Sequence, residues 1–146
     1  MVKSRHPEIS GSKENKQTVP KATEVLHALG RAFWKLADHY QLTQKEIAIL
    51  LGIKAENRQR LNHLKQKQEI PDDPDKRLRV SHLIGIHKNL RILFPQNRDV
   101  VYSWLKTRRE LFEGKSAMEF IAEDPMQSLP RMFSVRRLLD QIRVSG

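Results

Sequence analysis

The sequence predicts an all-α protein in which two helical units are joined through one long central helix. Three observations support this fold class. Apolar residues recur at helical spacing along most of the chain after residue 20. Two capping boxes, Thr43 with Glu46 and Ser116 with Glu119, mark the first residues of helices. No segment bounded by turns alternates apolar and polar residues with a period of two, as a half-buried strand would.

Composition points to a polyanionic partner. The 146 residues are enough for one compact domain or two very small ones. A formal net charge of +10 favours nucleic acid as the first candidate partner. The excess charge is spread along the chain, so a merely solubilising basic surface is the alternative.

Cysteine usage and hydropathy favour a cytoplasmic protein. There are no cysteines, which fits a reducing compartment and removes any disulfide framework or thiolate metal site. The longest unbroken apolar run, residues 47–51, is far too short to span a membrane. We therefore expect no membrane contact.

Residues 1–19 contain almost no large apolar side chains, and we interpret them as a disordered basic arm. Such an arm could add phosphate contacts on DNA. A flexible chain end is the alternative, and we favour it.

Residues 20–70 have the pattern of a helix-turn-helix DNA-binding unit. A first helix follows Pro20, with Trp34 placed to cover the core beside its apolar stripe. Thr43 begins a second helix, and Gly52 can adopt the left-handed conformation that ends it and turns the chain. The spacing has moderate specificity, because an ordinary helical hairpin would share about half of it. The stripe of the first helix consists of Val25, Leu26, Leu29, Phe33, Leu36 and Ala37.

A third helix, expected from Lys54 to Gln66, would be the recognition helix. Leu61 and Leu64 mark its buried side. A helix-turn-helix usually has an apolar residue in the middle of this helix, where the chain has Asn57-Arg58, so we expect a thin inner face. The candidates for base and phosphate contacts are Lys54, Gln59, Arg60, His63 and Lys67.

The central helix begins after an acidic hinge, residues 69–75, whose aspartates are better suited to capping than to metal binding. Asp73 is a candidate N-cap, Pro74 fits the first turn, and Pro95 ends the helix. Its apolar residues cover more than one side, which predicts burial from two directions. They are Leu78, Leu83, Ile84, Ile86, Leu90, Ile92, Leu93 and Phe94.

The rest of the chain is also expected to be helical. A short helix should span residues 99–106, and a loop over residues 108–114 should tuck Leu111 and Phe112 down. Ser116 caps the next helix, and a last helix carries apolar residues as far as Ile142.

Four segments of this C-terminal half occur in a specific order. They are residues 83–90 (LIGIHKNL) followed by Leu93-Phe94, then Trp104-Leu105, residues 111–118 (LFEGKSAM) and residues 135–140 (VRRLLD). With this set, residues 78–146 resemble the toxin-binding domain of the Xre/MbcA/ParS-type antitoxins, the partners of RES-domain toxins. The helix-turn-helix lies where that family has its Xre-like DNA-binding domain.

The resemblance implies an antitoxin of a type II toxin-antitoxin system. In that family the toxin consumes NAD, and the C-terminal domain of the antitoxin, here residues 71–146, blocks the toxin's active site. The helix-turn-helix represses the shared operon, and the expected partners are a RES-domain toxin, operator DNA and a second copy in a homodimer or larger assembly. The expected toxin-binding residues are Arg136, Arg137, Asp140, Arg143, Val144, Ser145 and Gly146.

Within this set, the carboxylate of Gly146 is a candidate substitute for a pyrophosphate in the toxin's NAD pocket. Arg143, one turn earlier, could pair with a catalytic group of the toxin. A frayed helix end is the alternative for these last residues.

Two other functions are alternatives to an antitoxin. A stand-alone helix-turn-helix regulator with a C-terminal dimerisation domain would share the fold and the charge. An enzyme is the weakest option, because the histidines lack the i, i+4 spacing of a metal pair and no glycine-rich phosphate loop follows a strand. Glu119 and Glu123 are expected to be solvated, and His82 and His87 to be hydrogen-bonded interior or interface side chains. We expect no cofactor, no metal site and no catalysis.

Overall fold

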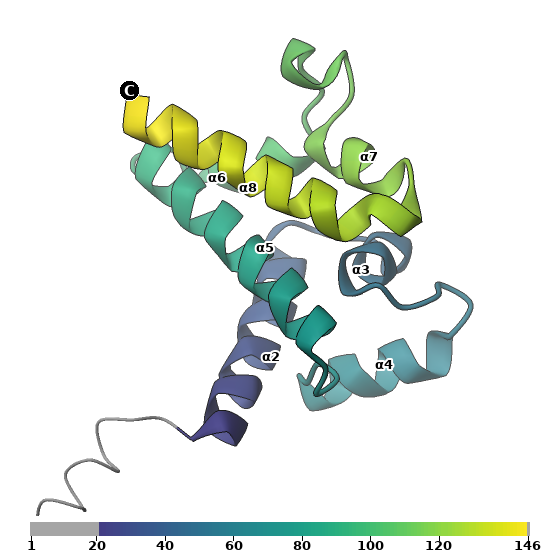
Figure 1. Cartoon of the computed structure of the whole chain (residues 1–146). Helices are drawn as coiled ribbons and strands as arrows, with labels where there is room; N and C mark the ends of the chain where they lie inside the picture. Colours follow the sequence, from purple (N-terminus) through teal and green to yellow (C-terminus); the bar gives the residue numbers. More distant parts are fainter. Residues whose placement is uncertain (1–20, 146) are drawn as a thin grey trace, which may run out of the picture.

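The computed structural model describes residues 21–145, and these residues form seven α-helices and three short 3-10 helices without any strand (Figure 1). The expected all-α class is therefore confirmed for this part of the chain. The arm predicted over residues 1–19, and Gly146, lie outside the described residues. No helix in the described range is long and apolar enough to cross a membrane.

The first two helices follow the expected pattern. Helix α2 spans Ala22–His39 and buries Trp34, whose indole Nε1 donates to the backbone oxygen of Glu69 at 2.8 Å. Helix α3 spans Gln44–Leu51 and begins with the expected capping box, in which Thr43 Oγ1 accepts from the backbone N–H of Glu46. Gly52 ends α3 in the left-handed conformation, with a φ of 68°.

Helix α4 spans Arg58–Lys67 and begins four residues later than expected, because residues 54–57 form a turn. Arg58 is consequently the first residue of the helix and is exposed. The placement of Asn57-Arg58 in the middle of the recognition helix was wrong. The inner face of α4 consists of Leu61 and Leu64, which are both buried.

Helix α5 spans Pro74–Leu93 and is the predicted central helix, with the side chain of Asp73 capping it by accepting from the backbone N–H of Asp75. It packs against α2 and against α8, so it is covered from two directions as expected. Leu78 and Ile92 differ from the prediction, since each is 47% exposed. Both lie near the ends of α5.

The segment after α5 is a series of short helices. Helix α6 covers Arg98–Ser103 and continues into a 3-10 helix, Trp104–Lys106, while α7 covers Ala117–Ala122 and starts at the expected Ser116 capping box. The loop expected over residues 108–114 contains another 3-10 helix, Glu110–Phe112. Phe112 tucks down as predicted, but Leu111 points to solvent and is 52% exposed.

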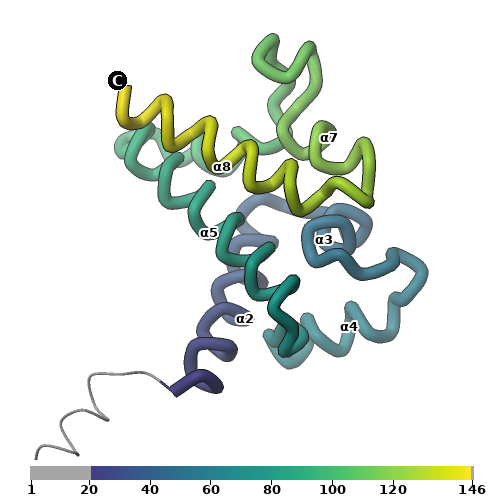
Figure 2. The backbone as a smooth tube through the Cα atoms, in the orientation of Figure 1, coloured from purple at the N-terminus to yellow at the C-terminus, as the bar shows by residue number. Residues whose placement is uncertain are grey.

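Helix α8 spans Ser128–Ser145 and follows a 3-10 turn, Pro125–Gln127. It runs beside α5 and in the same direction, as the tube in Figure 2 shows. Arg79 near the start of α5 contacts Ser128, and Asn89 near its end contacts Arg143. The pair is therefore parallel.

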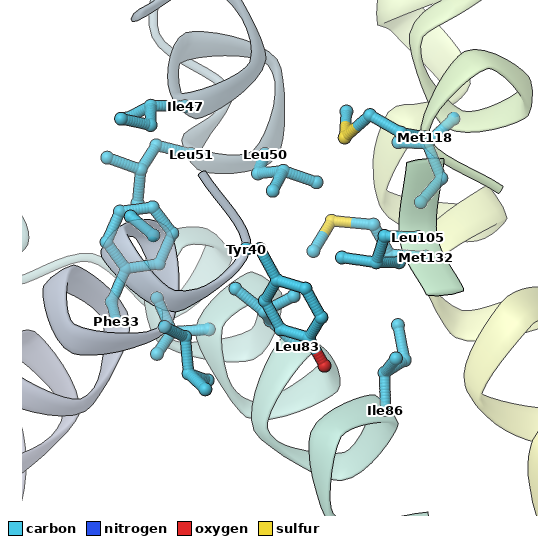
Figure 3. Packing of buried hydrophobic residues seen from close by; sticks show 14 of the residues in the cluster. Phe33, Tyr40, Ile47, Leu50, Leu51, Leu83, Ile86, Leu105, Met118 and Met132 are labelled. Carbon is cyan, nitrogen blue, oxygen red and sulfur yellow. The ribbon is translucent and has the colours of Figure 1, made fainter. Parts of the chain in front are cut away.

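One hydrophobic cluster connects the seven α-helices, and Figure 3 shows part of it. Phe33, Tyr40 and Leu50 enter it from α2 and α3, and Met118 and Met132 enter it from α7 and α8. Leu83 and Ile86 of α5 lie between the two groups (Figure 3). The division into units 20–70 and 71–146 stays a prediction. Described residues of both units contribute to this core.

Candidate functional site

The turn between α3 and α4 is held by side chains of α5. Arg79 is only 9% exposed, and its Nη1 donates to the backbone oxygen of Ile49 at 3.2 Å and to Ser128 Oγ at 2.8 Å. Lys76 Nζ donates to the backbone oxygen of Gly52 at 3.1 Å. Arg79 Nη1 also donates to the backbone oxygen of Leu50 at 3.4 Å, so these bonds add donors to the carbonyl groups at the end of α3.

Gly52 is required at this turn for two reasons. Its positive φ is strained for any residue that has a Cβ. A Cβ at this position would also lie 2.6 Å from Arg79 Cζ, closer than any real contact. The start of α4 is thus fixed relative to α5 by a turn that tolerates little change.

The outward side of α4 carries the predicted DNA-binding side chains. Gln59, His63 and Lys67 are spaced four residues apart and form one row, with Arg60 beside it. Lys54 lies in the preceding turn rather than on the helix. All five side chains are exposed, and none has a hydrogen bond or an ion pair within residues 21–145. The structure thus brings Gln59, Arg60, His63 and Lys67 together and places Lys54 before them.

The predicted toxin-binding residues of α8 are in a different situation, because three of them bind α5. Arg136 is half-buried, and its Nη1 donates to the backbone oxygen of Ser81 at 3.4 Å. Its guanidinium crosses α5 at Gly85, where a Cβ would overlap it.

Asp140 and Arg143 share one partner on α5. Asn89 is 3% exposed, and its Nδ2 donates to Asp140 Oδ1 at 2.7 Å. Arg143 Nε donates to Asn89 Oδ1 at 2.7 Å, while its Nη2 lies 4.0 Å from Asp140. The amide therefore uses both ends to hold two charged side chains of α8.

The remaining expected contacts are accessible. Arg137 is exposed beside an open cavity of about 620 Å³ between α7 and α8, whose lining includes Phe112 and Leu138. Val144 is 78% exposed and Ser145 is exposed at the end of α8. The structure does not bring these three residues into one cluster with Arg136.

Of the histidines and carboxylates considered for catalysis, His87, Glu119 and Glu123 have polar partners, whereas within residues 21–145 the hydrogen bond expected for His82 is absent at its buried Nδ1. His87 Nε2 lies 3.0 Å from the hydroxyl of Tyr102. His82 is buried against Phe133, and its Nδ1 has no partner among the described residues. Burial, and then the charge of Arg136, lower the pKa of His82.

Glu119 and Glu123 are exposed as expected, and both also form surface ion pairs. Arg108 forms two hydrogen bonds with Glu119, at 3.1 and 3.0 Å. These bonds, with the backbone N–H of Ser116, lower the pKa of Glu119 to about 2. Glu123 pairs with Lys115 and Arg131.

Three residues that position these surfaces were not predicted from the sequence: Arg79, Gly85 and Asn89. Asp75 lies four residues before Arg79 and pairs with it at 2.9 Å, so the i, i+4 spacing was an available signal. Nothing in the spacing of Gly85 or Asn89 identifies α8 as their neighbour, because that contact depends on tertiary packing.

Comparison with known protein families gives no matching family model, and a search of curated proteins gives no match.

Proposed function

We propose that this protein is an antitoxin that binds operator DNA through α4 and neutralises an NAD-consuming RES-type toxin through its C-terminal helices. The observation that carries the proposal is the outward face of α4, where cationic and amide side chains stand without partners within residues 21–145. The proposed toxin binding rests on the resemblance of residues 78–146 to the toxin-binding domain of the Xre/MbcA/ParS-type antitoxins. The exposed end of α8 supports it.

The chemistry of the α4 face suits DNA. An arginine can donate two parallel hydrogen bonds to guanine, and glutamine can pair with adenine, in the major groove. Lysines suit phosphates, because their charge needs no defined orientation. We therefore assign base contacts to Gln59, Arg60 and His63, and phosphate contacts to Lys54 and Lys67.

The DNA-binding test compares Arg60→Ala with Lys67→Ala at two salt concentrations. Losing a base contact should weaken operator binding by about 1 to 3 kcal/mol and relax the sequence preference. Losing a phosphate contact should weaken binding to all sequences and reduce the salt slope by about 1. Gel-shift titrations with DNA from upstream of the reading frame measure both effects.

Lys65→Ala is the matched control, because Lys65 is exposed on α4 but outside the proposed set. Unchanged affinity in all of these variants would show that α4 is a structural platform and would contradict the proposal.

The toxin-binding test uses Val144→Arg rather than a deletion that includes Arg143, because Arg143 also holds Asn89. A bulky cation at the exposed end of α8 should be excluded from a narrow pocket that binds a pyrophosphate. We expect inhibition of a RES-domain toxin to weaken at least tenfold, measured as NAD consumption during titration with the antitoxin. If Val144→Arg inhibits the toxin as well as wild type does, the end of α8 does not block the pocket. The surface around Arg137 would then be the candidate.

One observation favours the stand-alone regulator as a second candidate. Arg136, Asp140 and Arg143 already have partners on α5, which leaves fewer side chains of α8 for a toxin. Light scattering of the purified protein and the identity of the adjacent reading frame separate the two functions. A dimer that never inhibits a neighbouring RES-like toxin would be the regulator.

A further inference from the structure

We propose that the cleft between α2, the end of α5 and α6 binds a phosphate group. The cavity measures about 410 Å³ and lies away from the outward face of α4. Three permanent cations from three helices line it: Lys35 of α2, Arg91 of α5 and Arg98 of α6. His39 and His87 complete the ionisable lining, and no carboxylate belongs to it.

The cations of this cleft, like those on the outward face of α4, have no carboxylate partner within residues 21–145. Arg79, Arg108 and Arg131 each pair with a carboxylate. Within residues 21–145, neither Lys35 nor Arg91 has an ion pair or a side-chain hydrogen bond. Three like charges around one cleft repel each other, and an anion between them would relieve that repulsion.

Aromatic contacts order one wall of the cleft without a ligand. Tyr102 is stacked with His39 at 4.9 Å and with His87 at 5.5 Å between ring centroids. Arg98 lies 4.8 Å over the Tyr102 ring and donates to His39 Nδ1 at 3.5 Å. Because these contacts fix the guanidinium, less side-chain entropy is lost when it binds an anion.

The cations of the cleft also act on the pKa of His87. Burial is the largest cause that lowers the pKa of His87, and the charges of Arg91, His39 and Arg98 lower it further. On the neighbouring side of the stack the buried Tyr40 hydroxyl has no hydrogen-bond partner among the described residues. Burial also raises the pKa of Tyr40, so this hydroxyl adds no negative charge to the cleft.

A phosphate fits this lining better than a carboxylate does. Guanidinium groups bind phosphate oxygens through two parallel hydrogen bonds, and a lysine adds a third charged donor. A monoanionic carboxylate would leave most of the positive charge in the cleft uncompensated.

The phosphate could belong to a nucleic-acid backbone or to a small molecule. Toward α4 the cleft continues along a row of α2 side chains spaced four residues apart, His27, Arg31, Lys35 and His39. Lys67 of α4 lines the same surface beside His27 and Arg31, together with the carboxylates of Asp38 and Glu69. This continuity would let one nucleic-acid backbone contact both α4 and the cleft. The site itself does not depend on the proposed antitoxin function.

The test measures binding of sodium pyrophosphate by calorimetry and of a random-sequence DNA duplex by fluorescence anisotropy. Full-length wild type is compared with Lys35→Gln and Arg91→Gln, which remove one charge each from the cleft. Lys88→Gln is the control, because Lys88 is exposed on α5 and outside the lining. Imidazole nitrogen shifts of His39 and His87 in NMR spectra report whether the ligand occupies this cleft.

We expect pyrophosphate to shift both imidazoles, and each cleft variant to weaken its binding at least fivefold while Lys88→Gln changes it less than twofold. A parallel loss for duplex DNA identifies a nucleic-acid backbone as the source, and unchanged DNA binding identifies a small phosphate ligand. The proposal is overturned if wild type binds pyrophosphate without moving either imidazole, or if neither ligand distinguishes the cleft variants from the control. Failure of Arg60→Ala to affect operator binding would count against the α4 assignment alone.

Discussion

Helix α4 and helix α8 carry similar numbers of charged side chains but use them differently. The outward side chains of α4 are exposed and form no hydrogen bond or ion pair within the described residues, so they keep most of their hydration and rotamer freedom. The charged residues of α8 reach across to α5 through Ser81 and Asn89. The charges of α4 are therefore available to a partner, whereas most of those of α8 belong to the fold. Substitutions on α4 should change binding, and those on α8 should first change stability.

The largest expected effect comes from the core under both helices. Leu90 is fully buried on α5, and Leu90→Ala should lower the free energy of unfolding by about 2 to 5 kcal/mol because it leaves a cavity. The hydrophobic cluster includes residues of α4 and of α8, so both should unfold in one transition. Calorimetry measures this. Two transitions, with only one displaced, would show that the two units are independent.

The contact between α5 and α8 gives the next effect. Asn89→Ala leaves Asp140 and Arg143 without their shared buried partner and should cost about 1 to 3 kcal/mol. Urea denaturation measures the loss. Ser81→Ala is a suitable control, since only the backbone oxygen of Ser81 accepts from Arg136. If Asn89→Ala and Ser81→Ala were both as stable as wild type, the bonds between α8 and α5 would not contribute to the fold. The contrast between α8 and α4 would then be wrong.

The acid sensitivity of the fold should come from carboxylates outside α4, because α4 contains none. Glu119 at the start of α7 has a folded pKa of about 2, below its usual 4.5. Its contribution to stability is therefore present above pH 4.5 and is lost as the pH falls toward about 2. Urea midpoints at pH 6 and pH 3 should differ less in Glu119→Gln than in wild type. An equal difference would mean that other carboxylates cause the acid sensitivity.

The smallest effect on stability is expected on α4. Arg60→Ala removes an exposed side chain without a partner, so the free energy of unfolding should change by no more than about 0.5 kcal/mol. The same variant should lose operator affinity. A clear fall in melting temperature would show that Arg60 contributes to the fold and would remove the contrast with α8.

Local signals in the sequence were enough to predict the boundaries of several helices. Thr43 and Ser116 start helices as their capping boxes indicate, and Gly52 and Asp73 have the expected conformations and roles. These features depend on residues within one turn of each other. The sequence pattern could therefore specify them without knowledge of the tertiary structure.

Features that depend on distant neighbours were not predicted. Asn57-Arg58 was placed inside a helix, but the turn before α4 is longer than the usual spacing. Leu111 has the hydrophobicity of a core residue but points to solvent, because Phe112 occupies the position over Trp104. The binding of Arg143 to Asn89 depends on the parallel packing of α5 and α8, which no local pattern encodes.

The parallel arrangement of α5 and α8 also affects how the chain folds during synthesis. Two parallel helices cannot be joined by a tight turn, and here residues 94–127 connect them. The ribosome adds about 5 to 20 residues per second, so the α8-facing side of α5 waits for at least a few seconds before α8 is made. During that interval Leu83, Ile86 and Leu90 can be covered only by elements that precede α8, chiefly α2, α3 and α6. A nascent chain that has not yet reached Ser128 should therefore be the form of this protein most prone to aggregation and to chaperone binding.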